Sequence, residues 1–108
     1  MEEWGAPVIS EREKLRGLFI QLIDKIGRSL EAKELWHEAI QLYKRGLAIN
    51  ESVEKFYQRL MICHFNLGEK SDAMSVFERC RKFFLAGYGI EPGNKLNEIR
   101  SMIMRRSD

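Results

Sequence analysis

The chain has 108 residues, of which 44% are hydrophobic and 31% are charged, and its formal net charge is +2. This composition is ordinary for a globular protein and excludes a disordered chain, and the length leaves room for one core but hardly for a second. A charge so close to neutral lacks the concentrated positive field of most nucleic-acid-binding domains. The sequence shows neither a signal-peptide pattern nor an apolar run of membrane-spanning length, so we expect a cytoplasmic protein.

The first predicted helix covers residues 11–32 and follows an irregular lead-in over residues 1–10. Ser10 and Glu13 have the spacing of a capping box, and Gly5 and Pro7 argue against helix before them. Gly27 interrupts the helix without a turn partner, so we interpret it as a close contact with another helix. The apolar residues at helical spacing form one predicted stripe: Leu15, Leu18, Phe19, Leu22, Ile23, Ile26 and Leu30.

Four more helices are predicted, over residues 34–49, 52–67, 70–86 and 94–105. We expect Asn50 or Ser52 to cap the third helix, Gly68 to end it, and Ser71 to cap the fourth. The glycines and proline of residues 87–93 predict a loop before the fifth helix. No segment alternates convincingly between apolar and polar residues at period two, so the predicted fold is all-α.

A small–aromatic–small pattern occurs twice, and each member recurs after 34 residues (73 minus 39, for example). The two sets are Ala39, Tyr43 and Gly46, then Ala73, Phe77 and Cys80. This period is typical of tetratricopeptide repeats, which are helix hairpins that bury their apolar faces by stacking. We therefore predict a tetratricopeptide-like right-handed array of antiparallel helix pairs. Its repeats lie near residues 20–53 and 54–87, and the helix over 94–105 caps the array.

Four segments in order resemble a known family, whose members carry an Arg-Leu-Met, a Leu-Gly-Arg with a later Ala-Leu, a Tyr-Glu with a later Arg, and a Leu-Gly-Val-Glu-Pro. The matching residues are 59–61, 66–73, 77–81 and 89–92, of which Gly89-Ile90-Glu91-Pro92 is the most specific. Upstream, Trp4 looks like the family's tryptophan, and Glu11-Arg12-Glu13-Lys14-Leu15 looks like its charged first helix. Together, residues 11–108 resemble the bacterial transcriptional activator domain. Departures from the pattern are Tyr88, where leucine is usual, and Gly93-Asn94 in place of Ser-Pro.

The resemblance implies a domain that follows a winged-helix DNA-binding domain in transcription regulators and contributes regulatory and oligomerisation contacts. The predicted function is therefore a regulatory protein–protein interaction or oligomerisation domain, whose DNA-binding domain is not in this chain. The implied partner is that DNA-binding domain, a second copy in a homodimer, or the transcription machinery. We expect no contact with a membrane. A stand-alone tetratricopeptide adaptor that binds a peptide or a partner helix is the alternative.

Catalysis has few candidate residues in this chain. Only His37 and His64 are available as histidines, and Cys63 and His64, adjacent on one helix, point about 100° apart. Cys63 and Cys80 form no Cys-x-x-Cys pair, so we expect buried free thiols. No phosphate-binding loop and no metal-ligand spacing is present. We expect no enzyme activity, no catalytic residue, no cofactor and no metal.

A binding groove is predicted along the first helix of each pair, because stacked pairs are concave on that side. The partner-binding candidates are Gln21, Asp24, Arg28, Lys55, Gln58, Ile62 and Phe65, and the outward positions Glu31 and Asn66 share their register. Ile62 and Phe65 are predicted either to form an exposed apolar patch or to be covered by a terminal helix. Asp24 and Arg28 stand at the corresponding places where chaperone-clamping tetratricopeptide adaptors use lysine and asparagine, which argues against that type of adaptor.

Two further surfaces have open interpretations. A cationic cluster at Arg79, Arg81 and Lys82 is diluted by nearby glutamates, so we expect no direct binding to nucleic acid. The apolar residues near the two ends either mediate association or are buried by capping segments. They are Trp4, Phe19 and Ile20 at one end, and Phe83, Met102, Ile103 and Met104 at the other.

Overall fold

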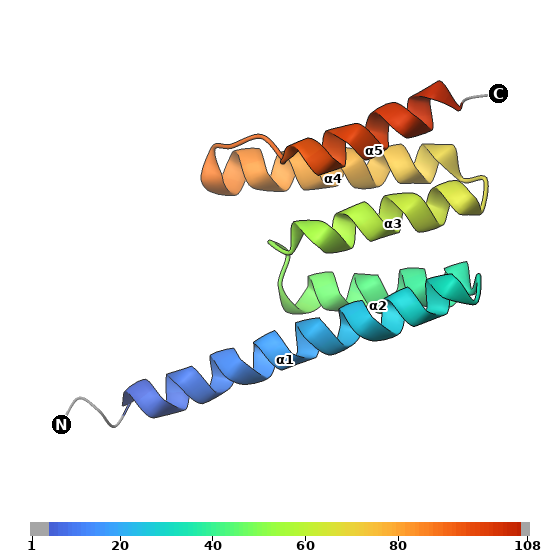
Figure 1. Cartoon of the computed structure of the whole chain (residues 1–108). Coiled ribbons are helices and arrows are strands. Elements are labelled where there is room, and N and C mark those ends of the chain that lie inside the picture. The colour runs from blue at the N-terminus through green and yellow to red at the C-terminus, as the bar shows by residue number, and fades with distance from the viewer. Residues whose placement is uncertain (1–4, 107–108) are drawn as a thin grey trace.

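The computed structural model describes the backbone of residues 5–106 and the side chains of residues 10–106. Successive helices run antiparallel and stack in chain order (Figure 1). The helices are α1 (Gly5–Ala32), α2 (Trp36–Ile49), α3 (Glu54–Asn66), α4 (Lys70–Tyr88) and α5 (Asn94–Arg105). Residues 5–106 contain no strand. Each helix packs against the next, and α5 also lies against α3, which confirms an all-α array of helix pairs with a C-terminal capping helix.

Small residues let the first three helices approach closely. A Cβ atom built on Gly27 of α1 would lie 2.5 Å from Cζ of Tyr43 on α2, and one built on Gly46 of α2 would clash with the ring of Phe56 on α3. The Tyr43 and Phe56 rings are themselves neighbours, with centroids 5.7 Å apart. The interpretation of Gly27 as a close helix contact is therefore confirmed.

The repeat positions lie in the core. Ala39, Tyr43, Ala73 and Cys80 are fully buried, and both cysteines of the chain are free thiols. Burial raises the pKa of Cys63 and of Cys80 to about 12. Both thiols are therefore protonated near neutral pH and lack the thiolate that redox or nucleophilic chemistry needs.

Several helix boundaries differ from the predictions. The backbone is helical from Gly5, so Ser10 lies inside α1 and does not cap it, and the expected irregular lead-in is wrong from residue 5 onward. Pro7 is compatible with this helix because the N–H groups of a first turn have no intrahelical partner. Trp4 lies outside the described residues. No side chain caps α3 or α4. Before α3, the Ser52 backbone N–H and hydroxyl both donate hydrogen bonds to Asn50 Oδ1, and Ser71 lies within α4.

Left-handed glycines end α3 and α4. Gly68 follows α3 with φ of 77°, as predicted. Helix α4 runs through Gly87 to Tyr88 and ends at Gly89, whose φ is 67°, so the loop begins two residues later than predicted. Gly93 N–H then donates to Glu54 Oε2 at 2.8 Å, which ties the loop before α5 to the start of α3.

Candidate interaction surface

Helix α1 carries an exposed apolar stripe over residues 15–26. We call its five residues the α1 stripe, and each exposes between 43% and 59% of its surface: Leu15, Leu18, Phe19, Leu22 and Ile26. Helix α1 has 28 residues and α2 has 14, so the helix antiparallel to α1 can cover only about half its length. Figure 1 shows the N-terminal half of α1 extending beyond the end of α2.

The predicted single stripe of α1 is therefore two faces. Ile23 is buried, and Ile20 and Leu30 are partly buried against the core. The residues of the α1 stripe lie on an adjacent face that no other described helix covers. Both faces have apolar residues at spacings of three and four, so the sequence pattern alone predicted one stripe. The position of α2 shows that only one of the two faces is buried.

Three charged residues of the predicted partner-binding groove lie close together: Asp24, Arg28 and Lys55. Lys55 Nζ on α3 lies 3.3 Å from Asp24 Oδ2 on α1, and Arg28 Nε lies 3.7 Å from Asp24 Oδ1. Gln21 is exposed on the same helix, and Gln58 is half-buried on α3. The face between α1 and α3 thus carries a mixed-charge cluster in which Asp24 offsets part of the positive charge.

Glu31 is not an outward groove residue, because only 8% of it is exposed. The Tyr43 hydroxyl donates to Glu31 Oε2 at 2.6 Å, and Arg59 Nε donates to the same oxygen at 3.0 Å while its Nη2 donates to Oε1. The hydrogen bond to Glu31 raises the pKa of Arg59, and burial raises the pKa of Tyr43 above its usual value. This network joins α1, α2 and α3 and leaves Glu31 no free oxygen for a partner.

Ile62 and Phe65 do not form an exposed patch. Both are partly buried and pack against the core, and α5 lies against their helix α3. The exposed patch is therefore not observed, and the contact of α5 with α3 agrees with the other alternative, a terminal helix over these residues. Asn66 is exposed at the end of α3, where its side-chain amide donates to the Ile62 carbonyl at 2.8 Å.

The cationic cluster on α4 is offset by acidic neighbours. Arg79 lies 3.6 Å from Glu51 and also stands over the Tyr57 ring, 5.8 Å from its centroid. Arg81 lies 3.4 Å from Glu91 in the loop before α5. These pairs spread the positive charge over a mixed surface and do not concentrate it.

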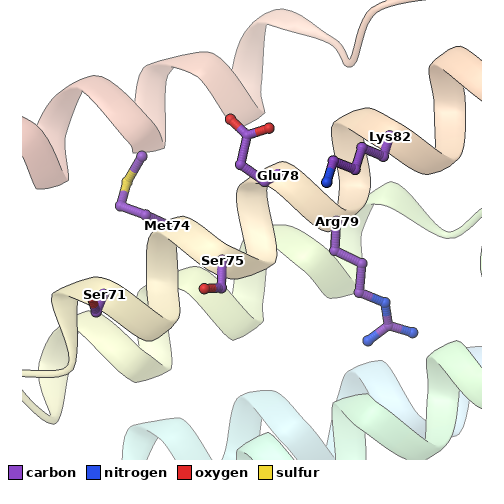
Figure 2. A pocket seen from close by; sticks show the side chains of 6 residues that line it. All are labelled: Ser71, Met74, Ser75, Glu78, Arg79 and Lys82. Atoms are coloured by element: carbon purple, nitrogen blue, oxygen red, sulfur yellow. The ribbon is translucent and has the colours of Figure 1, made fainter.

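A hollow of about 640 Å³ lies along the exposed face of α4 (Figure 2). All six of its lining residues come from α4: Ser71, Met74, Ser75, Glu78, Arg79 and Lys82. A ligand site normally encloses its ligand between elements, with most of the ligand surface buried. A hollow lined by one helix lacks that enclosure, so we assign it no small-molecule site.

His64, Glu69 and Asp72 bring potential metal ligands within 4.8 Å of one another where α3 passes into α4. However, His64 Nδ1 lies 2.7 Å from Glu69 Oε1, as in a hydrogen bond. Two ligands on one tetrahedral metal ion at about 2.1 Å would lie about 3.4 Å apart. The Glu69 backbone N–H also donates to the His64 carbonyl, so the contact between His64 and Glu69 is a hydrogen-bonded link between the end of α3 and the start of α4. The expectation of no metal stays a prediction.

The stacked helix pairs, the internal period and the buried repeat positions define a tetratricopeptide-like helical domain. The family model described as the bacterial transcriptional activator domain matches residues 2–104, so the chain belongs to that family. Membership places it among the domains of transcription regulators, as the four sequence segments indicated. Comparison with curated proteins and with solved structures found no match. Within the described residues, no helix has the length and apolarity needed to cross a membrane.

Proposed function

We propose that this chain is a regulatory protein-interaction and oligomerisation domain of a bacterial transcription regulator, acting in the cytoplasm. In this proposal DNA is bound by another domain of the regulator and not by these residues. The observation that carries the proposal is the α1 stripe. A monomer rarely leaves so many large apolar side chains together on one face unless a partner covers them.

The charges of the described surface support the same proposal. DNA affinity comes mainly from phosphate neutralisation by uncompensated Lys and Arg. Here Arg79 and Arg81 each lie beside a glutamate, and the overall charge is +2. Contacts with protein are therefore better supported than contacts with nucleic acid.

A stand-alone adaptor that binds a peptide between α1 and α3 is the second candidate. Gln21, Arg28 and Lys55 are exposed on that face and could bind acidic or polar groups. Asp24 competes for the same cations, which weakens this candidate relative to the α1 stripe.

A reporter experiment tests the proposal. The chain is fused to a heterologous DNA-binding domain that binds its operator as a monomer, upstream of a weak bacterial promoter. We expect the fusion to change transcription and Leu22→Glu to remove the effect, whereas Ile90→Glu, at an exposed position outside the α1 stripe, should retain it. Fluorescence anisotropy with random duplex DNA provides the counter-test. Submicromolar, salt-dependent binding that is lost on replacing Arg79, Arg81 and Lys82 would overturn the proposal.

A further inference from the structure

We propose that the α1 stripe binds a second copy of this chain, with the two α1 helices antiparallel and crossing near Leu18. This inference rests on the proposed function, because it names the partner of the same surface. It follows from the shape, the charges and the area of the stripe.

The shape of the stripe fits another helix. Leu15, Leu18 and Leu22 follow steps of three and four residues, and Ile26 continues the row by one turn. Such a row is straight and narrow, and the ridges of one helix of this kind fit the grooves of another. Because α2 packs on the face of α1 that holds Ile23 and Gly27, the face that carries this row is open to a helix from outside.

The charges beside Leu18 favour a second α1 in the antiparallel direction. Glu11 and Lys25 each lie seven residues from Leu18, so all three residues share one face of α1, and both charged side chains are exposed. When two copies cross antiparallel at Leu18, Glu11 of each copy lies opposite Lys25 of the other. A parallel pair would instead place Glu11 opposite Glu11 and Lys25 opposite Lys25, which is repulsive.

The area of the stripe suits a weak dimer. Five large apolar side chains, each about half exposed, present on the order of 400–500 Å² of apolar surface, the size of the largest apolar patch on a typical monomer, which is often functional. At a crossing near Leu18 the residues from Leu15 to Leu22 of the two copies meet, whereas Ile26 lies opposite Ser10. The two faces therefore bury somewhat less than about 1,000 Å², the area of a weak specific interface. The same face on both copies also makes the interface self-complementary, as two-fold dimers require.

Sedimentation equilibrium on the 108-residue chain, from micromolar to millimolar concentration, tests the inference. We expect a monomer–dimer equilibrium. Leu18→Glu should weaken dimerisation by roughly tenfold or more, because it places two carboxylates at the crossing point. Ile90→Glu is the matched control, since Ile90 is similarly exposed outside the stripe, and it should dimerise like the wild type. Circular dichroism checks that each variant keeps its helix content.

Charge reversal tests the antiparallel arrangement. Glu11→Lys and Lys25→Glu should each weaken the dimer by roughly threefold to tenfold, and the double reversal should restore it because the opposite charges then exchange places. Two single reversals that weaken the dimer without rescue by the double variant would overturn the antiparallel crossing. A wild-type chain that stays monomeric at millimolar concentration would overturn the second copy as the partner. The test with random duplex DNA would still decide whether DNA is bound by these residues, because it does not depend on dimerisation, and a reporter effect from a monomeric chain would point to a partner other than a second copy.

Discussion

The two terminal helices of the array differ in how far their apolar residues are buried. In α5, Leu96, Ile99 and Ile103 are buried against the preceding helices. In α1, by contrast, the residues of the α1 stripe stay about half exposed over residues 15–26. Helix α5 has 12 residues and lies along both α3 and α4, whereas α1 is twice as long as its neighbour α2. A terminal helix thus buries the face that its neighbours contact, and in α1 a second apolar face beside the buried one stays open.

This difference resolves the two alternatives for the chain ends. At the C-terminal end the helix acts as a cap, because Ile103 is buried and Met102 is partly buried, although Met104 remains exposed. At the N-terminal end Ile20 packs against the core but Phe19 is exposed. A cap and an open surface therefore occur at opposite ends of one array.

The largest expected effect tests whether the C-terminal half of α1 is anchored to the array. Arg59→Ala leaves the buried Glu31 carboxylate without its charged partner, and we expect a loss of about 3–5 kcal/mol in the free energy of unfolding. Urea denaturation measures the loss. Arg28→Ala, which removes an exposed arginine from a surface pair, should stay within about 0.5 kcal/mol of the wild type. Equal stability of the two variants would contradict an anchoring network.

The next effect tests the cap. Leu96 is fully buried in α5, so Leu96→Ala should cost about 2–5 kcal/mol through lost burial and a cavity. Thermal unfolding followed by circular dichroism measures it. Met104→Ala on the exposed side of the same helix should change stability by less than about 0.5 kcal/mol. If Leu96→Ala were as mild as its control, α5 would not be a cap and the contrast with α1 would disappear.

A smaller effect compares the two halves of α1 directly. Gly27→Ala places a methyl group against the buried Tyr43 ring, whose hydroxyl is held by Glu31, and should cost about 1–2 kcal/mol after the gain in helix propensity. Gly17→Ala lies in the open half, where an added Cβ meets nothing within 4 Å. It should stabilise the chain by roughly 0.5–1 kcal/mol. Two stabilising substitutions would show that the Gly27 contact is loose.

Much of the fold was predictable because periodic patterns report burial on regular helices. The recurrence of Ala39, Tyr43 and Gly46 predicted the helix pairs, and the predicted helix over residues 94–105 matches the bounds of α5. Helix starts were less predictable. Ser10, Ser52 and Ser71 carry capping signals, but a local preference of about 1 kcal/mol yields to the packing of the whole helix.

The interaction surface was predictable only in part. Apolar spacing placed Leu18 and Leu22 on the same helix as Ile23, but the face on which α2 packs decides which of them is covered. Glu31 was misplaced for a related reason. Its partner Arg59 lies 28 residues away, and repeat register alone cannot show that two charged side chains meet inside the array.

The smallest effect uses two adjacent residues to test whether the α1 stripe is open in the monomer. Leu22 is 51% exposed and Ile23 is 6% exposed, so the same substitution samples the two faces of α1 at one level of the helix. At a concentration low enough to keep the chain monomeric, Leu22→Ser should change the free energy of unfolding by less than about 0.5 kcal/mol.

Ile23→Ser at the adjacent position should cost at least about 2 kcal/mol, because it removes buried apolar volume and places a hydroxyl in the core. Urea denaturation of both variants beside the wild type measures the difference. If Leu22→Ser were as costly as Ile23→Ser, the α1 stripe would be covered within a single chain. The opposite behaviour of the two ends of the array would then be lost, and with it the surface on which a second copy is proposed to bind.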